Sequence, residues 1–66
     1  MEFNVKRLRE SKGWTQAELS EASGVGRITI SRLESGVLKE TSAGTLMKLA
    51  NALGCTMNDI VSISNA

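Results

Sequence analysis

One predicted helix in this sequence carries arginine, serine and isoleucine on a single face, where a solvent-facing helix usually carries glutamate and lysine. If Ile30 and Leu33 point inward, the residues opposite them form an outward stripe, because helical positions i, i+3, i+4 and i+7 share a face. The stripe consists of Ile28, Ser31, Arg32 and Ser35, with Arg27 beside it at the first turn. Arginine donates two hydrogen bonds to guanine O6 and N7, an aliphatic side chain contacts the thymine methyl group, and serine bonds a base or a phosphate. The stripe therefore suits the floor of the DNA major groove, and the ordinary alternative is a polar face with one exposed apolar residue.

Two short helices joined by a glycine-marked turn are predicted to position this stripe. The first begins with a capping box, in which the Thr15 hydroxyl and the Glu18 carboxylate satisfy free amides of the first turn. It ends before Gly24, which supplies the positive φ needed to leave the helix. The second helix spans about residues 27–35 and stops at Gly36. This arrangement presents the second helix to the major groove of DNA.

Gln16 strengthens the DNA-binding interpretation. It lies in the first turn of its helix, where free amides and the helix dipole attract a phosphate. Its carboxamide is able to donate to the same phosphate and to brace a neighbouring side chain. The alternative is an ordinary exposed glutamine.

Three further helices are predicted around these two. They span about residues 4–12, 42–54 and 56–61, and the segment 62–66 is expected to be frayed. The helix over 42–54 has one buried stripe, formed by Leu46, Leu49, Ala50 and Leu53. Five short helices with short loops predict a compact all-α fold and a single domain over residues 1–66.

Composition narrows the function classes. A chain of 66 residues forms a modest core, and we expect no separate effector domain. The net charge of +1 is weak for a nucleic-acid binder, so the argument depends on where the charges lie. No apolar run reaches the ~18 residues that span a membrane, and no signal peptide is visible. We therefore expect a cytoplasmic protein without a membrane partner.

The sequence shows no arrangement of residues typical of metal or nucleophilic chemistry, and no serine or acidic pair forms a recognisable catalytic pattern. Cys55 is the only cysteine and the chain has no histidine, which leaves no disulfide, no zinc site and no common general base. We interpret Cys55 as a small buried apolar residue. The sequence argues against an enzyme, and we expect no cofactor, metal or small-molecule ligand.

The segment 15–36 resembles the helix-turn-helix of the phage repressor and Cro family, also called the xenobiotic-response-element family. The matching positions are Gln16, Ser20, Gly24, Val25, Ile30 and Leu33, together with the runs 30–36 and 46–54. The resemblance covers about residues 5–61 and implies a five-helix, lambda-repressor-like DNA-binding domain. Its members usually bind palindromic operators as twofold dimers, which implies a sequence-specific repressor acting as a homodimer.

The resemblance also implies roles for individual residues. The glutamine at the Gln16 position contacts the DNA backbone, and the loop carrying Lys39 approaches phosphates. Residues of the second motif helix face base edges. The candidate DNA-binding residues are therefore Gln16, Arg27, Ile28, Thr29, Ser31, Arg32 and Lys39. The family also pairs an arginine and a glutamate at the positions of Arg9 and Glu34 in a partly buried salt bridge.

The chain departs from the family pattern at several positions. Ser20 and Ser23 stand where small apolar residues are commoner, so we expect looser packing between the two motif helices. Gly26 replaces the usual serine or threonine cap and lacks a side-chain oxygen. The loop before Ser42 lacks a frequent proline, and Cys55 takes a place often held by valine.

The C-terminal segment has more apolar side chains than a short helix buries on one side. Met57, Ile60 and Val61 are therefore candidate homodimer residues, and the alternative is that Ile60 and Val61 close the core. A second function also remains open. A protein-interaction module, such as an antitoxin subunit, keeps this fold without reading bases.

Overall fold

Side-chain caps begin three of the helices in the described part of the chain, and a glycine directly follows three of them. The computed structural model describes residues 2–62 of the chain. The helices are α1 (Val5–Ser11), α2 (Gln16–Ser23), α3 (Arg27–Ser35), α4 (Ala43–Leu53) and α5 (Met57–Ile60). Capping boxes begin α2 and α5, and Gly24 and Gly36 follow α2 and α3 with φ of 76° and 83°. Those positive φ values explain why glycine stands at both positions.

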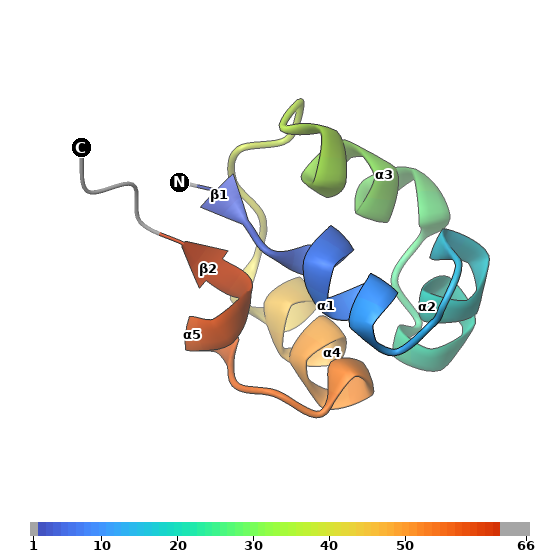
Figure 1. Ribbon diagram of the computed structural model, residues 1–66. Helices are drawn as coiled ribbons and strands as arrows, with labels where there is room; N and C mark the ends of the chain where they lie inside the picture. Colours follow the sequence, from blue (N-terminus) through green and yellow to red (C-terminus); the bar gives the residue numbers. More distant parts are fainter. Residues whose placement is uncertain (1, 63–66) are drawn as a thin grey trace.

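The core lies where α1, α2, α3 and α4 meet (Figure 1). Leu19, Ile30 and Leu49 are fully buried, and each comes from a different helix. The complete buried set is Val5, Leu19, Val25, Ile30, Leu33, Leu46, Leu49, Ala50, Leu53 and Ile60. The four predicted inward positions of α4 all belong to it. Cys55 is half-buried against this core, and burial raises the pKa of its thiol.

A short strand pair joins the two ends of the described chain, which the sequence did not lead us to expect. Strands β1 (Glu2–Phe3) and β2 (Val61–Ser62) pair antiparallel, with Phe3 opposite Val61. The Asn4 amide donates to the Ile60 carbonyl at 2.7 Å and continues this link. Two residues per strand are too few to show an alternating pattern, so no sequence signal announced them. The fold remains a helical domain with this small addition.

The C-terminal expectations need two corrections. Ile60 is fully buried within the protomer, so it closes the core and is not a surface residue for a dimer. Met57 and Val61 are half-buried against the same core. Ser62 pairs in β2 and is not frayed, whereas the rest of the predicted frayed end, residues 63–66, lies outside the described residues. Across residues 2–62, no helix has both the length and the apolar character needed to cross a membrane.

Candidate nucleic-acid interface

Helix α3 buries one side and exposes the other. Ile30 and Leu33 are buried, whereas Ile28 is 68% exposed. The other members of the outward stripe, Ser31, Arg32 and Ser35, are exposed together with Arg27, and Thr29 is half-buried. Helix α3 lies along one edge of the bundle (Figure 1), with α1 and α2 packed against its inner side. The predicted inward and outward sides of this helix are therefore confirmed.

Serine hydroxyls hold the turn between α2 and α3. Ser20 Oγ donates to the Val25 carbonyl at 2.7 Å, and Ser23 Oγ donates to the Leu19 carbonyl at 2.7 Å. Ser23 Oγ also accepts from the Val25 amide at 3.1 Å. A small apolar side chain cannot make these bonds. Both serines therefore make backbone hydrogen bonds at the end of α2 and its turn, and the expected looser packing between the two motif helices stays a prediction.

An ion pair connects α1 to α3. Arg9 Nε lies 2.8 Å from Glu34 Oε2, and Arg9 Nη2 lies 3.0 Å from Glu34 Oε1. Arg9 Nη1 also donates to the Trp14 carbonyl at 2.6 Å. The two charged side chains are only 11% and 5% exposed. The partly buried pair implied by the family resemblance is therefore present, with the two-pronged geometry that suits a guanidinium and a carboxylate.

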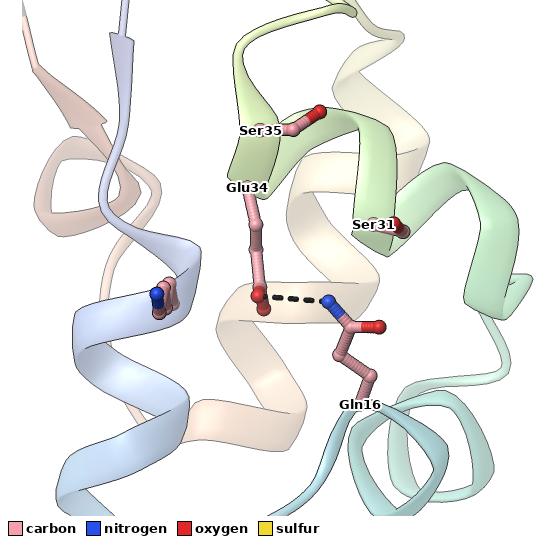
Figure 2. A pocket seen from close by; sticks show the side chains of 5 residues that line it. Gln16, Ser31, Glu34 and Ser35 are labelled. Atoms are coloured by element: carbon pink, nitrogen blue, oxygen red, sulfur yellow. Dashed lines mark hydrogen bonds between the residues drawn. The ribbon is translucent and has the colours of Figure 1, made fainter.

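Glu34 also holds the side chain of Gln16. Gln16 Nε2 donates to Glu34 Oε1 at 3.0 Å, a bond between α2 and α3 (Figure 2). An ionised carboxylate only accepts hydrogen bonds, so it selects the nitrogen end of the carboxamide. The Gln16 oxygen points away from Glu34 (Figure 2), and the second N–H of the amide stays available for another acceptor. The neighbour braced by Gln16 is thus Glu34, which the sequence did not identify.

These contacts keep Glu34 ionised. Burial disfavours the charged form, but the hydrogen bonds from Arg9 and Gln16 outweigh that effect and hold the pKa of Glu34 below its usual value. The positive charges of Arg9 and Lys6 act in the same direction. The hydrogen bond to Glu34 raises the pKa of Arg9. Both side chains of the ion pair are therefore charged around neutral pH.

A polar hollow of about 190 Å³ opens beside this network (Figure 2). Its lining comes from three helices: Lys6 of α1, Gln16 of α2, and Ser31, Glu34 and Ser35 of α3. Two of the predicted site residues, Gln16 and Ser31, meet here. Lys6 was missed because it lies outside the motif, and its approach to α3 depends on how α1 packs.

The loop carrying Lys39 leaves from the end of α3. The Leu38 amide donates to the Arg32 carbonyl at 3.1 Å, and Leu38 packs against the core. Lys39 itself is exposed and is not among the residues that line the polar hollow. The predicted site residues therefore lie in three places: on the exposed side of α3, around the hollow and on this loop.

Comparison with known proteins places most of the chain in one family. The family model described as Helix-turn-helix matches residues 5–60. The chain is 33% identical over 58 residues to the HTH-type transcriptional regulator SutR of Escherichia coli, covering 88% of this chain and 32% of that protein. It is 40% identical over 50 residues to an uncharacterized HTH-type transcriptional regulator of Mycobacterium tuberculosis, covering 76% of this chain and 19% of that protein. The chain thus spans about a fifth to a third of the length of these relatives.

Solved structures share the fold. The crystal structure of SinR, a master regulator for biofilm formation, in complex with DNA superposes with a TM-score of 0.81 at 27% identity, covering 83% of this chain and 87% of that one. A hypothetical transcription factor from Neisseria gives a TM-score of 0.76 at 30% identity, covering 85% of this chain and 62% of that one. With the buried and exposed sides of α3 in place, the family match over residues 5–60 shows that the chain belongs to the helix-turn-helix family of the Cro/C1 type.

Proposed function

We propose that the protein is a repressor that binds a specific sequence of double-stranded DNA as a homodimer on a palindromic operator. Helix α3 contacts the bases, and occupation of the operator blocks transcription. The proposed contact residues are Gln16, Arg27, Ile28, Thr29, Ser31, Arg32 and Lys39.

The observation that carries the proposal is the chemistry of the exposed side of α3. Ile28 is 68% exposed and stands between Arg27 and Arg32, both exposed, on a helix whose other side is buried. A large exposed aliphatic side chain gains free energy when a partner covers it, and a thymine methyl group is a fitting partner. The fold match to SinR in complex with DNA supports the same interpretation.

The proposed contact residues outside α3 touch the DNA backbone. The first amides of α2 have no carbonyl one turn back, so the start of this helix attracts a phosphate. Gln16, held by Glu34, contributes its remaining N–H at the same place. Lys39 approaches a second phosphate from its loop. Such contacts fix the position of the protein on the duplex, and the base contacts of α3 supply specificity.

Homodimer formation is part of the proposal. Since Ile60 lies in the protomer core, Met57 and Val61 are the candidates that remain at the C-terminal end. Sedimentation at several concentrations tests the association. A monomer at every concentration without DNA, and on a palindromic duplex as well, contradicts the homodimer.

Selection of bound duplexes from a random pool tests the function as a whole. We expect a palindrome whose half-sites lie about one helical turn, roughly 10 base pairs, apart. Binding weakens steeply with salt, because each phosphate contact releases counterions. Failure to enrich any sequence, together with no salt-dependent binding, contradicts the proposal.

Arg32 provides the residue-level test. Arg32→Ala is expected to weaken binding to the selected site by ~1–3 kcal/mol and to relax specificity at one position if it donates to a guanine. Lys48→Ala is the matched control, since Lys48 is an exposed cation on α4. An equal loss on random DNA assigns Arg32 to a phosphate instead.

A second candidate function is protein recognition by the same fold. Its support is the solved complex between SinR and the SinI protein, in which SinR matches this chain with a TM-score of 0.80 at 27% identity. A module of this kind binds a partner protein without selecting any DNA sequence. The random-pool selection therefore separates the two candidates.

A further inference from the structure

The polar hollow lies beside the proposed base-contacting side of α3 and has features of its own. Its volume of about 190 Å³ holds several water molecules at the ~30 Å³ that each occupies in the liquid. Its lining combines an ammonium group from Lys6, an amide from Gln16 and two hydroxyls from Ser31 and Ser35, with Glu34 as the acidic member. Lys6, Ser31 and the second N–H of Gln16 are able to donate hydrogen bonds to an anion, whereas Ser35 Oγ donates to the Arg32 carbonyl at 3.3 Å.

We infer that this hollow binds one backbone phosphate of the duplex, with Lys6 of α1 as its cation. The inference deepens the proposed function and rests on it. It adds a contact from outside the helix-turn-helix motif and extends the DNA-binding surface across α1. The bound group is a phosphodiester of the DNA strand that passes beside α3, because Ser31 and Ser35 belong to both the hollow and the outward stripe.

The acidic floor of the hollow does not repel a phosphate strongly, because Glu34 is already matched. Three hydrogen bonds reach its carboxylate: two from Arg9, at 2.8 and 3.0 Å, and one from Gln16 at 3.0 Å. The charges of Arg9 and Glu34 cancel, so the net charge at the hollow is the positive charge of Lys6. Lys6 lies near enough to Glu34 for its charge to lower the pKa of that carboxyl.

Lys6 is the cation of α1 that is available for this role. Arg9 is bound to Glu34 and to the Trp14 carbonyl. The Lys12 ammonium lies 5.3 Å from the centre of the Trp14 ring, away from the hollow lining. Arg7 is exposed but does not line the hollow. Lys6 and Arg7 are therefore adjacent residues of equal charge on the same helix, and only Lys6 lines the hollow.

That pair defines the experiment. Lys6→Gln and Arg7→Gln each remove one exposed charge and are expected to melt like the wild type, since surface changes usually cost less than ~0.5 kcal/mol. Binding to one duplex is measured at several salt concentrations. Loss of one phosphate contact lowers the slope of log affinity against log salt concentration by ~0.9. The ratio of the wild-type affinity to the Lys6→Gln affinity should therefore fall about three- to fourfold between 50 and 200 mM salt. Arg7→Gln should leave the slope close to that of the wild type.

A scan with single neutral methylphosphonate linkages locates the phosphate. We expect one linkage at which neutralisation weakens the wild type and Arg7→Gln but leaves Lys6→Gln unchanged. The inference is overturned if Lys6→Gln and Arg7→Gln lose the same slope, or if no linkage behaves in this way, because the effect of Lys6 is then a general one of charge. It is also overturned if inorganic phosphate at constant ionic strength gives saturable NMR shifts at Lys6 and Ser31 while Lys6→Gln changes neither the salt slope nor the response to any linkage, since the hollow then holds a free anion only.

The same data separate this inference from the proposed function. A wild type that binds duplex DNA with a salt-dependent affinity, while Lys6→Gln behaves like Arg7→Gln, refutes the phosphate site alone. A wild type that binds no duplex at any salt concentration refutes both.

Discussion

Replacement of Glu34 by alanine removes the acidic partner of a nearly buried ion pair. Arg9 then keeps its hydrogen bond to the Trp14 carbonyl but loses both bonds to the carboxylate, and Gln16 loses its partner as well. The Arg9 side chain is 11% exposed, so water compensates the lost carboxylate poorly. The variant thus contains an uncompensated, mostly buried positive charge.

The expected loss is large relative to the stability of so small a protein. Breaking one partner of a buried ion pair costs ~3–5 kcal/mol. At roughly 0.05–0.15 kcal/mol per residue, the free energy of unfolding of this chain is about 3–10 kcal/mol in total. A domain of this size loses ~4–8 °C in Tm per kcal/mol. Glu34→Ala should therefore lower the Tm by more than about 12 °C.

Urea unfolding followed by the fluorescence of Trp14, the one tryptophan in the chain, measures the effect. Glu21→Ala is the matched control, because Glu21 is an exposed carboxylate on α2 and should change stability by less than ~0.5 kcal/mol. The double variant Arg9→Met with Glu34→Leu should recover most of the loss, since replacement of both partners by apolar groups is often neutral.

Two outcomes would refute this reasoning. A loss of under about 1 kcal/mol for Glu34→Ala means that water screens the pair as it screens a surface salt bridge. A double variant as unstable as Glu34→Ala means that the side-chain shapes, and not the unpaired charge, are responsible.

Two further predictions concern pH and the turn. The pKa of Glu34 in the folded protein lies below its usual value of 4.5, so its contribution to stability is complete above that value and is lost as pH falls through the lower folded pKa. In urea titrations, the free energy of unfolding of the wild type should therefore approach that of Glu34→Gln on acidification. A difference between the two that stays constant with pH contradicts this. Gly26→Ser should raise stability by a few tenths of a kcal/mol, because Gly26 caps α3 at φ −59° with no side-chain oxygen. Gly24→Ser, at φ 76°, should instead cost ~1–2 kcal/mol, and thermal melts that rank the two variants the other way refute the backbone argument.

Interactions within one helical turn were predictable from the sequence. The predicted capping box of Thr15 with Glu18 forms, and Thr56 forms a second one with Asp59, because in both the partners are three residues apart. The sides of α3 also follow from spacing alone, since Ile30 points inward whenever the helix forms against a core. The hydroxyls of Ser20 and Ser23 also find backbone partners within five residues, which an apolar side chain cannot use.

Contacts between distant residues needed the packed structure. Hydropathy alone allowed Ile60 either to cover a dimer partner or to fill the core, and only the closure of α5 onto the bundle places it inside. The pairing of Phe3 with Val61 joins opposite ends of the chain, and nothing in two residues of sequence encodes a partner so far away.

The sequence by itself therefore determined the helices, their caps and the outward stripe of α3, because those depend on hydrogen bonds and periodicity within a few residues. The tertiary structure decided which side chains from different helices meet. The bond from Gln16 to Glu34 crosses from α2 to α3, and Lys6 reaches the same hollow from α1. Such meetings depend on how the helices cross around Leu19, Ile30 and Leu49, and a crossing geometry is a property of the whole core rather than of any one segment.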